Sequence, residues 1–485
     1  MTSIKVNQCS PPKDDAKTLL DLSGKHVHFV GIGGCGMSGL ARLTDQCGAI
    51  CSGTDRVETE LTVALENDGI QVAFSQCAES VPMDCDLVVV SAAIALDHPE
   101  LTAAKQRGIQ IMKYAQLLGH LMAQKTGVAI AGTHGKSTTT SLLSHILIRC
   151  GLDPSLIVGA HCPQIGGGWR VGDSNLLIAE ACEFDRSFHN LHPKHAVILN
   201  IEEDHLDMYR GIDEIIEAFT IFAERIPPQG SLLIHHEMPH RLAVTAKLRC
   251  DVQTLGFAPQ ADWRIEWVEP IASKGGQGAT YVHLFESTNK ITAQWRSPMP
   301  GEHMAYNTAA AALIAHRLGA SWDAITDAIE TFEGLDRRMQ CLGYHPIGDG
   351  SVTVMDDYGH HPTEIDTTLR ALRRQYHPKR LVCVFQPHQH SRTRFLMEQF
   401  AASFAEADIV IVPEIYFVRD SEKERHAVRA ADLVDQLRLR GKQAMHLHPF
   451  EAIVEQLQLI ADDGDLLVTM GAGDVWKVAY QFLGR

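Results

Sequence analysis

The chain has 485 residues, and its apolar fraction of 45% and charged fraction of 21% are those of a globular protein rather than a disordered one. A formal net charge of −16 excludes a protein that coats nucleic acid through a basic surface, so an anion site would have to be built locally from glycine loops and helix N-termini. The length predicts about three domains.

Ten short segments rich in Val, Ile and Leu predict buried strands. Their apolar residues follow one another without the alternation of a half-exposed strand, which is typical of parallel sheets. In chain order these segments are residues 26–30, 86–91, 127–131, 175–180, 196–200, 231–235, 351–355, 381–385, 408–412 and 465–470. Helical segments lie between them at residues 102–107, 139–150, 304–318 and 362–375. The alternation predicts an α/β protein with mostly parallel sheets.

One region departs from this alternation. Residues 254–296 carry Trp263, Trp267, Tyr281 and Trp295 in roughly alternating apolar runs, with a glycine-rich turn at 275–278, and they predict an antiparallel β appendage. Two strand–glycine-loop–helix units and a third run of strands from residue 351 predict three domains, at residues 1–121, 122–334 and 335–485.

The sequence also favours a cytosolic protein. No apolar run reaches the roughly 18 residues of a membrane span, and the first 25 residues lack the apolar core of a signal peptide. The 12 cysteines are scattered without a C-x-x-C pair, so we expect free thiols rather than a zinc site. Membrane and nucleic-acid partners are not expected, and the oligomeric state is left open.

The first glycine loop follows the strand at 26–30 and matches G-x-G-x-x-G. Such glycines allow a tight turn in which helix N–H groups face a pyrophosphate. The loop residues expected to bind a nucleotide diphosphate are Gly31, Gly33, Gly34, Cys35, Gly36 and Met37. Asp55 lies about 20 residues on, where a ribose-binding acid would be found. A simple turn or cap role for Asp55 is an equal alternative.

The second glycine loop follows the strand at 127–131 and predicts an ATP site. Its residues are Gly132, Thr133, His134, Gly135, Lys136, Ser137 and Thr138. Lys136 would neutralise the phosphates and the Ser137 hydroxyl would bind Mg²⁺. A strict Walker A motif needs a further glycine at the position of Ile130, so this is a shortened form.

Acidic residues follow the next two predicted strands. The carboxyl ends of parallel strands share one edge of a sheet, so these acids should lie beside the phosphate loop. Mg²⁺ prefers hard oxygen ligands, which makes Glu180 the first candidate ligand. His205 is the second candidate, as a softer ligand to another divalent ion. For the other acids we expect a solvated loop: Glu183, Asp185, Glu202, Glu203, Asp204 and Asp207.

Six strings along the chain together resemble the Mur ligases, from residue 31 to about residue 475. They are GIGGCGMSG (31–39), GTHGKST (132–138), EACEFD (180–185), NIEEDH (200–205), DDYGHHPTE (356–364) and FQPH (385–388). The resemblance implies a Rossmann-like N-terminal domain for a UDP-sugar, a central P-loop ATPase-type domain, and a Rossmann-like C-terminal domain for an amino acid. It also implies an activity: ATP-dependent ligation of L-alanine to the carboxylate of UDP-N-acetylmuramate through an acyl phosphate.

The resemblance further assigns roles to residues that local patterns leave undefined. Arg338, the second arginine of the 337–338 pair, matches an ATP contact, Asn307 an adenine contact, and Asp357 and His360 positions near the ATP ribose and phosphates. Tyr358, His388 and Arg392 match positions around the amino acid. A carboxylate and a γ-phosphate are both anionic, so their approach needs cations, and the catalytic residues expected are Lys136, His205 and Arg338.

The chain also departs from the family pattern. Cys182 and Phe184 replace polar residues, Met304 replaces an asparagine, and Gln389 replaces an arginine beside the amino-acid site. The last two bear on nucleotide contacts and amino-acid preference, not on the reaction class. Other functions are considered beside this one. The nearest alternative is a sibling ligase that adds another amino acid or a preformed peptide, or a folylpolyglutamate-type ligase. A nicotinamide-dependent dehydrogenase would use only the first glycine loop, and an ATP-gated binding protein would catalyse no ligation.

Overall fold

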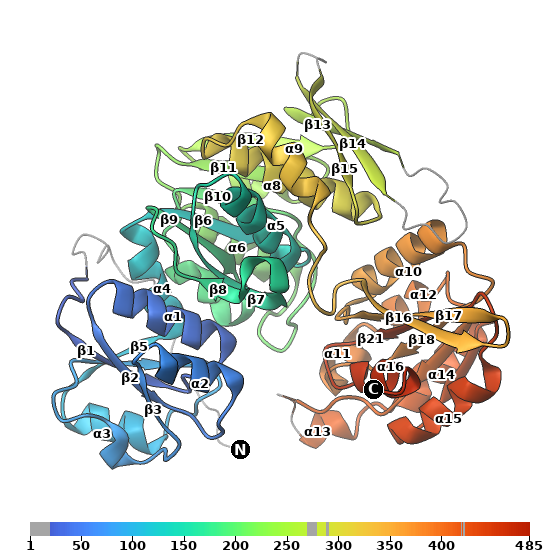
Figure 1. Cartoon of the computed structure of the whole chain (residues 1–485), viewed down its shortest axis with the longest axis horizontal. Coiled ribbons are helices and arrows are strands. Elements are labelled where there is room, and N and C mark those ends of the chain that lie inside the picture. Colours follow the sequence, from blue (N-terminus) through green and yellow to red (C-terminus); the bar gives the residue numbers. More distant parts are fainter. Residues whose placement is uncertain (1–19, 269–278, 288–290, 419, 421) are drawn as a thin grey trace. The chain divides into compact units, whose positions relative to one another are not determined.

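The computed structural model describes residues 20–268, 279–287, 291–418, 420 and 422–485, and it shows an α/β protein with three sheets (Figure 1). Contacts divide the chain into two compact units. The first runs up to Gly127 and includes Asn190–Pro193, and the second holds Val128–His189 and Lys194–Arg485. The predicted α/β class is confirmed, whereas the domain boundaries at 122 and 335 stay predictions. Among the described residues no helix is both long and apolar enough to span a membrane.

The first unit contains a five-stranded parallel sheet in the order β3-β2-β1-β4-β5. Its strands are β1 (His26–Val30), β2 (Ile50–Thr54), β3 (Gln71–Ala73), β4 (Leu87–Val90) and β5 (Gln110–Lys113). Its helical elements are α1 (Cys35–Gln46), α2 (Glu60–Asn67), η1 (Ala78–Ser80), α3 (Pro99–Gln106) and α4 (Tyr114–Ala123). The strand order reverses between β1 and β4, and ligands of such sheets bind outside the carboxyl ends of the strands at this point.

The second sheet has ten strands in the order β15-β14-β13-β12-β11-β10-β6-β9-β7-β8. They are β6 (Thr126–Ala131), β7 (Ser155–Cys162), β8 (Gly167–Arg170), β9 (Leu176–Ala181), β10 (His195–Ile198), β11 (Ser231–His235), β12 (Asp251–Gly256), β13 (Trp263–Val268), β14 (Thr280–Glu286) and β15 (Ile291–Ser297). The predicted β appendage is confirmed as the antiparallel ribbon β13–β15, and β13 also pairs with β12, so the ribbon continues the main sheet. The predicted turn at 275–278 lies outside the described residues.

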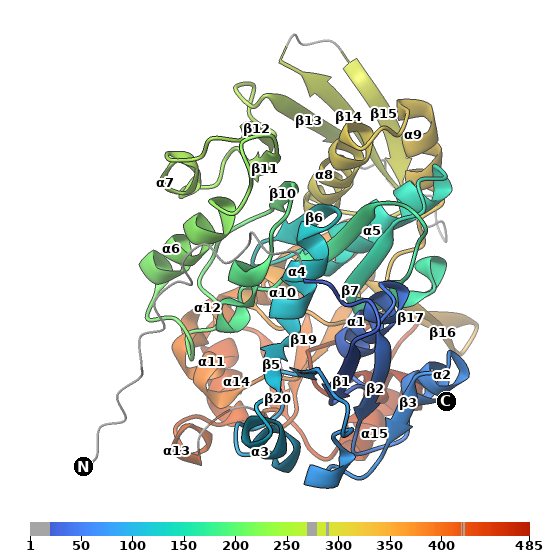
Figure 2. The ribbon, with the colours of Figure 1, turned by 90° about the vertical axis from the view of Figure 1, so that its left-hand side faces the viewer.

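Two helices of this region lie inside its core. The helical elements are α5 (Lys136–Arg149), η2 (Pro163–Ile165), η3 (Phe184–Asn190), α6 (Ile212–Ala223), α7 (Arg241–Thr245), α8 (Glu302–Arg317) and α9 (Trp322–Glu330). Helices α5 and α8 pack side by side (Figure 2), and both are buried along most of their length. Their buried residues follow one another around the helix rather than along one face, which is typical of the interior of a domain.

The third sheet has six strands in the order β16-β17-β21-β18-β19-β20, and only β16 runs antiparallel to its neighbour. They are β16 (Gln340–Ile347), β17 (Gly350–Asp357), β18 (Leu381–Phe385), β19 (Ile409–Val412), β20 (Gln443–His446) and β21 (Leu466–Met470). The helices are α10 (Pro362–Tyr376), α11 (His390–Phe395), α12 (Met397–Ser403), α13 (Glu422–Arg425), α14 (Ala430–Leu439), α15 (Phe450–Ile460) and α16 (Trp476–Phe482). Apolar clusters cover both faces of this sheet, which explains its continuous Val, Ile and Leu runs.

Candidate active site

The second glycine loop joins β6 to α5. Gly132 and Gly135 have φ values of 143° and 82°, which favour glycine, and Gly135 caps the helix that begins at Lys136. A Cβ atom on Gly135 would lie 3.0 Å from the side-chain oxygen of Asn307 on α8. The predicted phosphate loop and the predicted adenine contact are therefore neighbours.

Lys136 is held at this loop by three acceptors. Its Nζ donates to the carbonyl oxygens of Gly132 at 2.6 Å and Thr133 at 3.0 Å, and it lies 3.0 Å from the carboxylate of Glu183. Burial acts to lower the pKa of Lys136, but the charge of Glu183 outweighs it and the pKa is raised, so Lys136 stays a cation. His205 completes the group, with Nε2 3.8 Å from Glu183.

Glu183 is a correction to the sequence prediction. It was expected in a solvated acidic loop, but only 3% of the residue is exposed. The expectation was wrong because the partner that compensates its buried charge, Lys136, is 47 residues away along the chain. Asp204, expected in a similar loop, is also buried, whereas Glu203 and Asp207 are exposed as predicted.

The predicted magnesium ligands Ser137 and Glu180 lie together. The Glu180 carboxylate accepts the N–H of Gly159 at 2.8 Å, and the nearby Ser137 side chain acts to lower its pKa. Burial acts against this and raises the pKa of Glu180. A half-buried carboxylate near a hydroxyl is a set of hard oxygen donors suited to a divalent cation.

The two arginines at the start of the third sheet have different environments. Arg337 donates to Asp356 at 3.0 Å and to the carbonyl oxygen of Gly471 at 2.6 Å, so its charge is used inside the C-terminal region. Arg338 lies 3.6 Å from Glu364 and stacks over the ring of Tyr358. Of the two arginines, Arg338 lines a large cavity.

A cavity of about 870 Å³ lies between the central and C-terminal sheets of the second unit. Residues predicted for the ATP site line it from both sides: His134, Gly135, Thr138, Asn307, Arg338 and Asp357. Asp357 accepts backbone N–H groups from Met339 at 2.8 Å and Gly359 at 2.7 Å, and burial raises its pKa to about 6. The wall of this cavity therefore combines a phosphate loop, an amide, a guanidinium and a carboxyl group.

The segment after β10 connects the two sides of this cavity. We call Glu202, Glu203 and Asp204 the acidic segment, and each of its residues contacts the C-terminal region. Glu202 accepts from the hydroxyl of Thr363 at 2.6 Å and the carbonyl oxygen of Glu203 accepts from His361 at 3.1 Å. The contact of Asp204 is an ion pair with two nitrogens of Arg392 at 2.8 and 3.1 Å.

His134 of the phosphate loop lies between two carboxylates. Its Nε2 is 3.6 Å from Glu202 and its Nδ1 is 3.3 Å from Glu364. Burial acts to lower its pKa, but both carboxylates act against this and the pKa is raised to about 9. His134 is therefore a cation at neutral pH.

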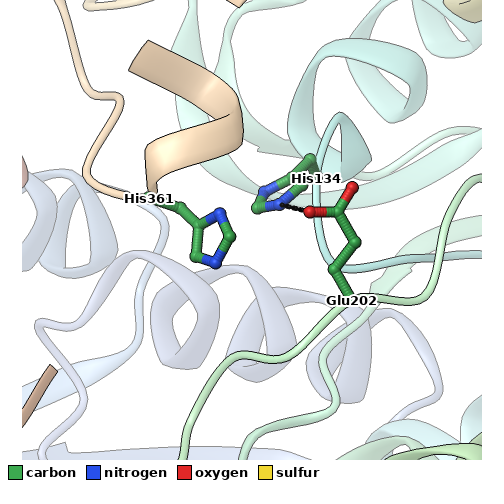
Figure 3. Close-up of side chains that lie close together, drawn as sticks. All are labelled: His134, Glu202 and His361. Carbon is green, nitrogen blue, oxygen red and sulfur yellow. Dashed lines mark ion pairs between the residues drawn. The ribbon is translucent and has the colours of Figure 1, made fainter. Parts of the chain in front are cut away.

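His134, Glu202 and His361 also lie close enough together to suggest a metal site (Figure 3). The ring of His361 argues against it. Its Nδ1 accepts from the backbone N–H of Thr363 and its Nε2 donates to Glu203, so neither nitrogen has a lone pair to offer. This group is a polar contact between the phosphate loop and the start of α10.

The three residues predicted for the amino acid form one cluster. Arg392 donates to Nδ1 of His388 at 3.3 Å, and the His360 ring packs between those of His388 and Tyr358. Burial lowers the pKa of His360 to about 4. Two nitrogens of Arg392 are already bound to Asp204, which leaves its Nη1 edge toward His388. Gln389, next to this cluster, is buried with a φ of 69°.

In the first unit, the glycine loop begins where β1 ends. The N–H of Gly31 donates to the carbonyl oxygen of Thr54 at 2.8 Å, and that of Gly33 donates to the Asp55 carboxylate at 2.8 Å. Gly34 caps α1, which begins with Cys35, Gly36 and the buried Met37. The Asp55 carboxylate, at the end of β2, thus supports this turn, which is one of its two expected roles.

Family models match three consecutive parts of the chain. Residues 26–126 match the Mur ligase family catalytic domain, 130–315 the Mur ligase middle domain, and 337–473 the Mur ligase glutamate ligase domain. The chain belongs to the Mur ligase family.

Relatives of this Mur ligase extend over nearly its full length. A UDP-N-acetylmuramate–L-alanine ligase of Caldanaerobacter subterraneus subsp. tengcongensis is 39% identical over 460 residues, which cover 95% of this chain and 97% of the relative. The crystal structure of a UDP-N-acetylmuramate–alanine ligase from Thermotoga maritima matches with a TM-score of 0.74 and 25% identity, over 95% of this chain and 98% of that one. A murein peptide ligase from Psychrobacter arcticus shares the fold, with a TM-score of 0.65, 23% identity and coverage of 95% and 98%.

Several residues of this Mur ligase site were not found from the sequence. Glu364 contacts both His134 and Arg338, and Thr363 contacts the acidic segment. Their position at the first turn of α10, directly after His361 and Pro362, is a typical helix-start pattern. That pattern indicates a cap, and it contains no signal for a partner more than 150 residues away.

Proposed function

We propose that this chain joins L-alanine to the carboxylate of UDP-N-acetylmuramate and converts ATP to ADP and phosphate, as a step of peptidoglycan precursor synthesis. The observation that carries the proposal is the cavity of about 870 Å³, which is lined by the phosphate loop, by Asn307, and by Arg338 and Asp357 from the C-terminal region. The names of the relatives support the choice of substrates.

In this proposal ATP lies along the cavity with its base at Asn307 and its phosphates at the glycine loop. An oxygen of the muramoyl carboxylate attacks the γ-phosphorus, the bond to ADP breaks, and an acyl phosphate forms. Lys136 and Arg338 are the cations that offset repulsion between the two anions, which is the main task of a phosphoryl-transfer site. The amine of L-alanine then attacks the acyl carbon, loses a proton, and displaces phosphate.

Mg²⁺ fits the residues on one side of the loop. Ser137 and Glu180 would hold it, because they offer neighbouring hydroxyl and carboxylate oxygens. Burial disfavours the negative charge of Glu180, and a bound cation would compensate this charge. When bound, the ion would neutralise phosphate charge. His205 was expected to bind another divalent ion, and its contact with Glu183 also suits it to support Lys136.

The UDP-sugar would bind at the glycine loop of the first unit, where Gly31, Gly33, Gly34, Cys35, Gly36 and Met37 form the turn and Asp55 supports it. L-Alanine would bind beside Tyr358, His388 and Arg392. Because Arg392 is shared with Asp204, only part of its guanidinium is available to an α-carboxylate. We place the reaction in the cytoplasm, where the eleven free cysteines of the described residues would be in their ordinary reduced state.

Phosphate release tests the proposal. We expect release only when ATP, UDP-N-acetylmuramate and L-alanine are all present, with a new amide product. The Arg338→Met variant should lose activity by about 10²–10³-fold, while Arg370→Met, on the exposed face of α10, should not. Faster turnover with another amino acid or a preformed tripeptide would indicate a sibling ligase. Phosphate release without an amide product would contradict ligation altogether.

A further inference from the structure

Three potential metal ligands meet at an edge of the C-terminal sheet. The parallel strands β19 and β20 are neighbours, and their last residues, Val412 and His446, are paired in register. Glu414 lies two residues beyond β19, and His448 two residues beyond β20. The topology therefore brings one carboxylate and two imidazoles to the same point.

The distances match those between ligands of one metal ion. The Glu414 Oε1 atom is 3.3 Å from Nε2 of His446 and 3.7 Å from Nε2 of His448, and the three donor atoms lie within 4.8 Å of one another. Two ligands of a tetrahedral zinc ion, with bonds of about 2.0–2.1 Å, are about 3.4 Å apart. Only small side-chain rotations would be needed to place all three around one centre.

The hydrogen bonding of His446 supports this arrangement. Its Nδ1 lies 2.9 Å from the carbonyl oxygen of Val412, and because a carbonyl can only accept, Nδ1 carries the proton. In the neutral ring Nε2 then presents a lone pair toward the Glu414 carboxylate. Two acceptors facing each other require a cation between them, either a proton on Nε2 or a metal ion. A histidine that binds metal through one nitrogen commonly donates from the other to a backbone carbonyl.

We propose that Glu414, His446 and His448 bind a divalent transition-metal ion of the zinc class, with water in the remaining coordination position. Imidazole ligands favour Zn²⁺, Co²⁺, Ni²⁺ or Cu²⁺ over Mg²⁺. The site is accessible from solvent, since the side chains of Glu414 and His448 are 62% and 60% exposed while His446 is only 25% exposed. It is separate from the oxygen ligands proposed for the nucleotide's magnesium ion.

Such an ion would fasten a segment that leads to the proposed amino-acid cluster. The carbonyl oxygen of Glu414 accepts from the side chain of Gln386 at 3.2 Å, and the N–H of Tyr416 donates to the carbonyl oxygen of Pro387 at 2.9 Å. The ring of Tyr416 stacks on that of His388. Metal binding would thus restrain the segment that supports His388.

Equilibrium dialysis of the full-length protein against Zn²⁺, after treatment with EDTA and without nucleotide, tests the proposal. We expect the wild type to bind one equivalent more than the Glu414→Gln and the His446→Gln/His448→Gln variants, and the affinity of this equivalent to fall by at least about tenfold when a ligand is removed. Co²⁺ in place of Zn²⁺ should give a visible spectrum that both variants lack. An Asp84→Asn variant, which alters an exposed carboxylate paired with a single histidine, is the matched control and should bind as the wild type does.

Thermal unfolding gives a second measurement. Zn²⁺ should raise the melting temperature of the wild type and of Asp84→Asn but not of the two ligand variants, because the ion binds only the folded site. In EDTA, Glu414→Gln and Asp84→Asn should melt like the wild type, since these two carboxylates are 62% and 79% exposed. The double histidine variant loses the hydrogen bond from His446 to Val412, so its melting temperature with Zn²⁺ is compared with its own value in EDTA. Equal metal content and equal melting shifts in wild type and ligand variants would overturn the proposal. The same conclusion would follow if the wild type bound no ion, with only a proton between His446 and Glu414.

Discussion

The pair formed by Lys136 and Glu183 should contribute to stability as well as to catalysis, and the two contributions can be separated. Their side chains are 15% and 4% exposed, and the distance between the charged atoms is 3.0 Å. Replacing Lys136 with Met would leave the Glu183 carboxylate buried with only His205 nearby, at 3.8 Å. Loss of one partner of a buried ion pair costs about 3–5 kcal/mol. Because His205 can supply part of the missing charge, we expect a value near the lower end.

A second substitution should restore the stability but not the activity. In the Lys136→Met/Glu183→Gln double variant no buried charge is left alone, so the free energy of unfolding should return to within about 1 kcal/mol of the wild type. Phosphate release should stay reduced by about 10²–10³-fold or more in both variants, since neither has the cation that we propose for the phosphates.

Urea unfolding followed by tryptophan fluorescence is a suitable assay. Five of the six tryptophans lie between residues 169 and 322, so the signal reports mainly on the region that contains the pair. The single Glu183→Gln variant completes the cycle. Equal stabilities of Lys136→Met and the wild type, or a double variant as unstable as the single one, would refute the reasoning that the lysine compensates a buried carboxylate.

Three further predictions concern other parts of the structure. Glu180→Gln should raise the Mg²⁺ concentration for half-maximal activity by at least about tenfold, and an unchanged Mg²⁺ dependence would exclude Glu180 as a ligand. The pKa of His134 is raised to about 9, above its ordinary value, so its stabilising effect is complete below about pH 6.5 and lost as the pH rises through 9. The urea midpoint should therefore fall between pH 7 and 9.5 in the wild type but not in His134→Gln, and parallel curves would contradict this. Gly119→Ala would place a Cβ atom 1.9 Å from the carbonyl oxygen of Asn190, so it should destabilise the first unit by about 1–3 kcal/mol; an unchanged melting temperature would show that α4 can move away.

Two of the strands that were missed lie at the edges of the third sheet. All ten predicted segments are strands, because both faces of a parallel sheet are covered and select continuous Val, Ile and Leu. Strand β20, with the sequence QAMH, lies at one edge, and β16, which has no fully buried residue and contains Gly343 and Pro346, lies at the other. Edge strands bury less apolar surface, so their sequences give little signal.

The site residues divide in a similar way. The two glycine loops and Lys136 could be predicted because the residues that form such a loop are adjacent in the sequence, as Gly135 and Lys136 are. The burial of Asp204 could not, because it depends on Arg392, which is 188 residues away. The resemblance to the Mur ligases implied a role for Arg392, but as a contact of the amino-acid substrate. Its pairing with Asp204 depends on how two sheets of the second unit meet, which no local pattern encodes.

The polar contacts of the acidic segment determine how the strength of its junction with the C-terminal region depends on temperature. Its three residues contact the C-terminal region through carboxylates and a carbonyl group, and only the adjacent Leu206 packs against the apolar core there. Exposing polar surface lowers the heat capacity, whereas exposing apolar surface raises it. Separation of the acidic segment from α10 and α11 should therefore have little of the positive heat-capacity change that accompanies unfolding of a hydrophobic core. The strength of this junction should then vary almost linearly with temperature, without the curvature that governs the stability of the sheets on either side.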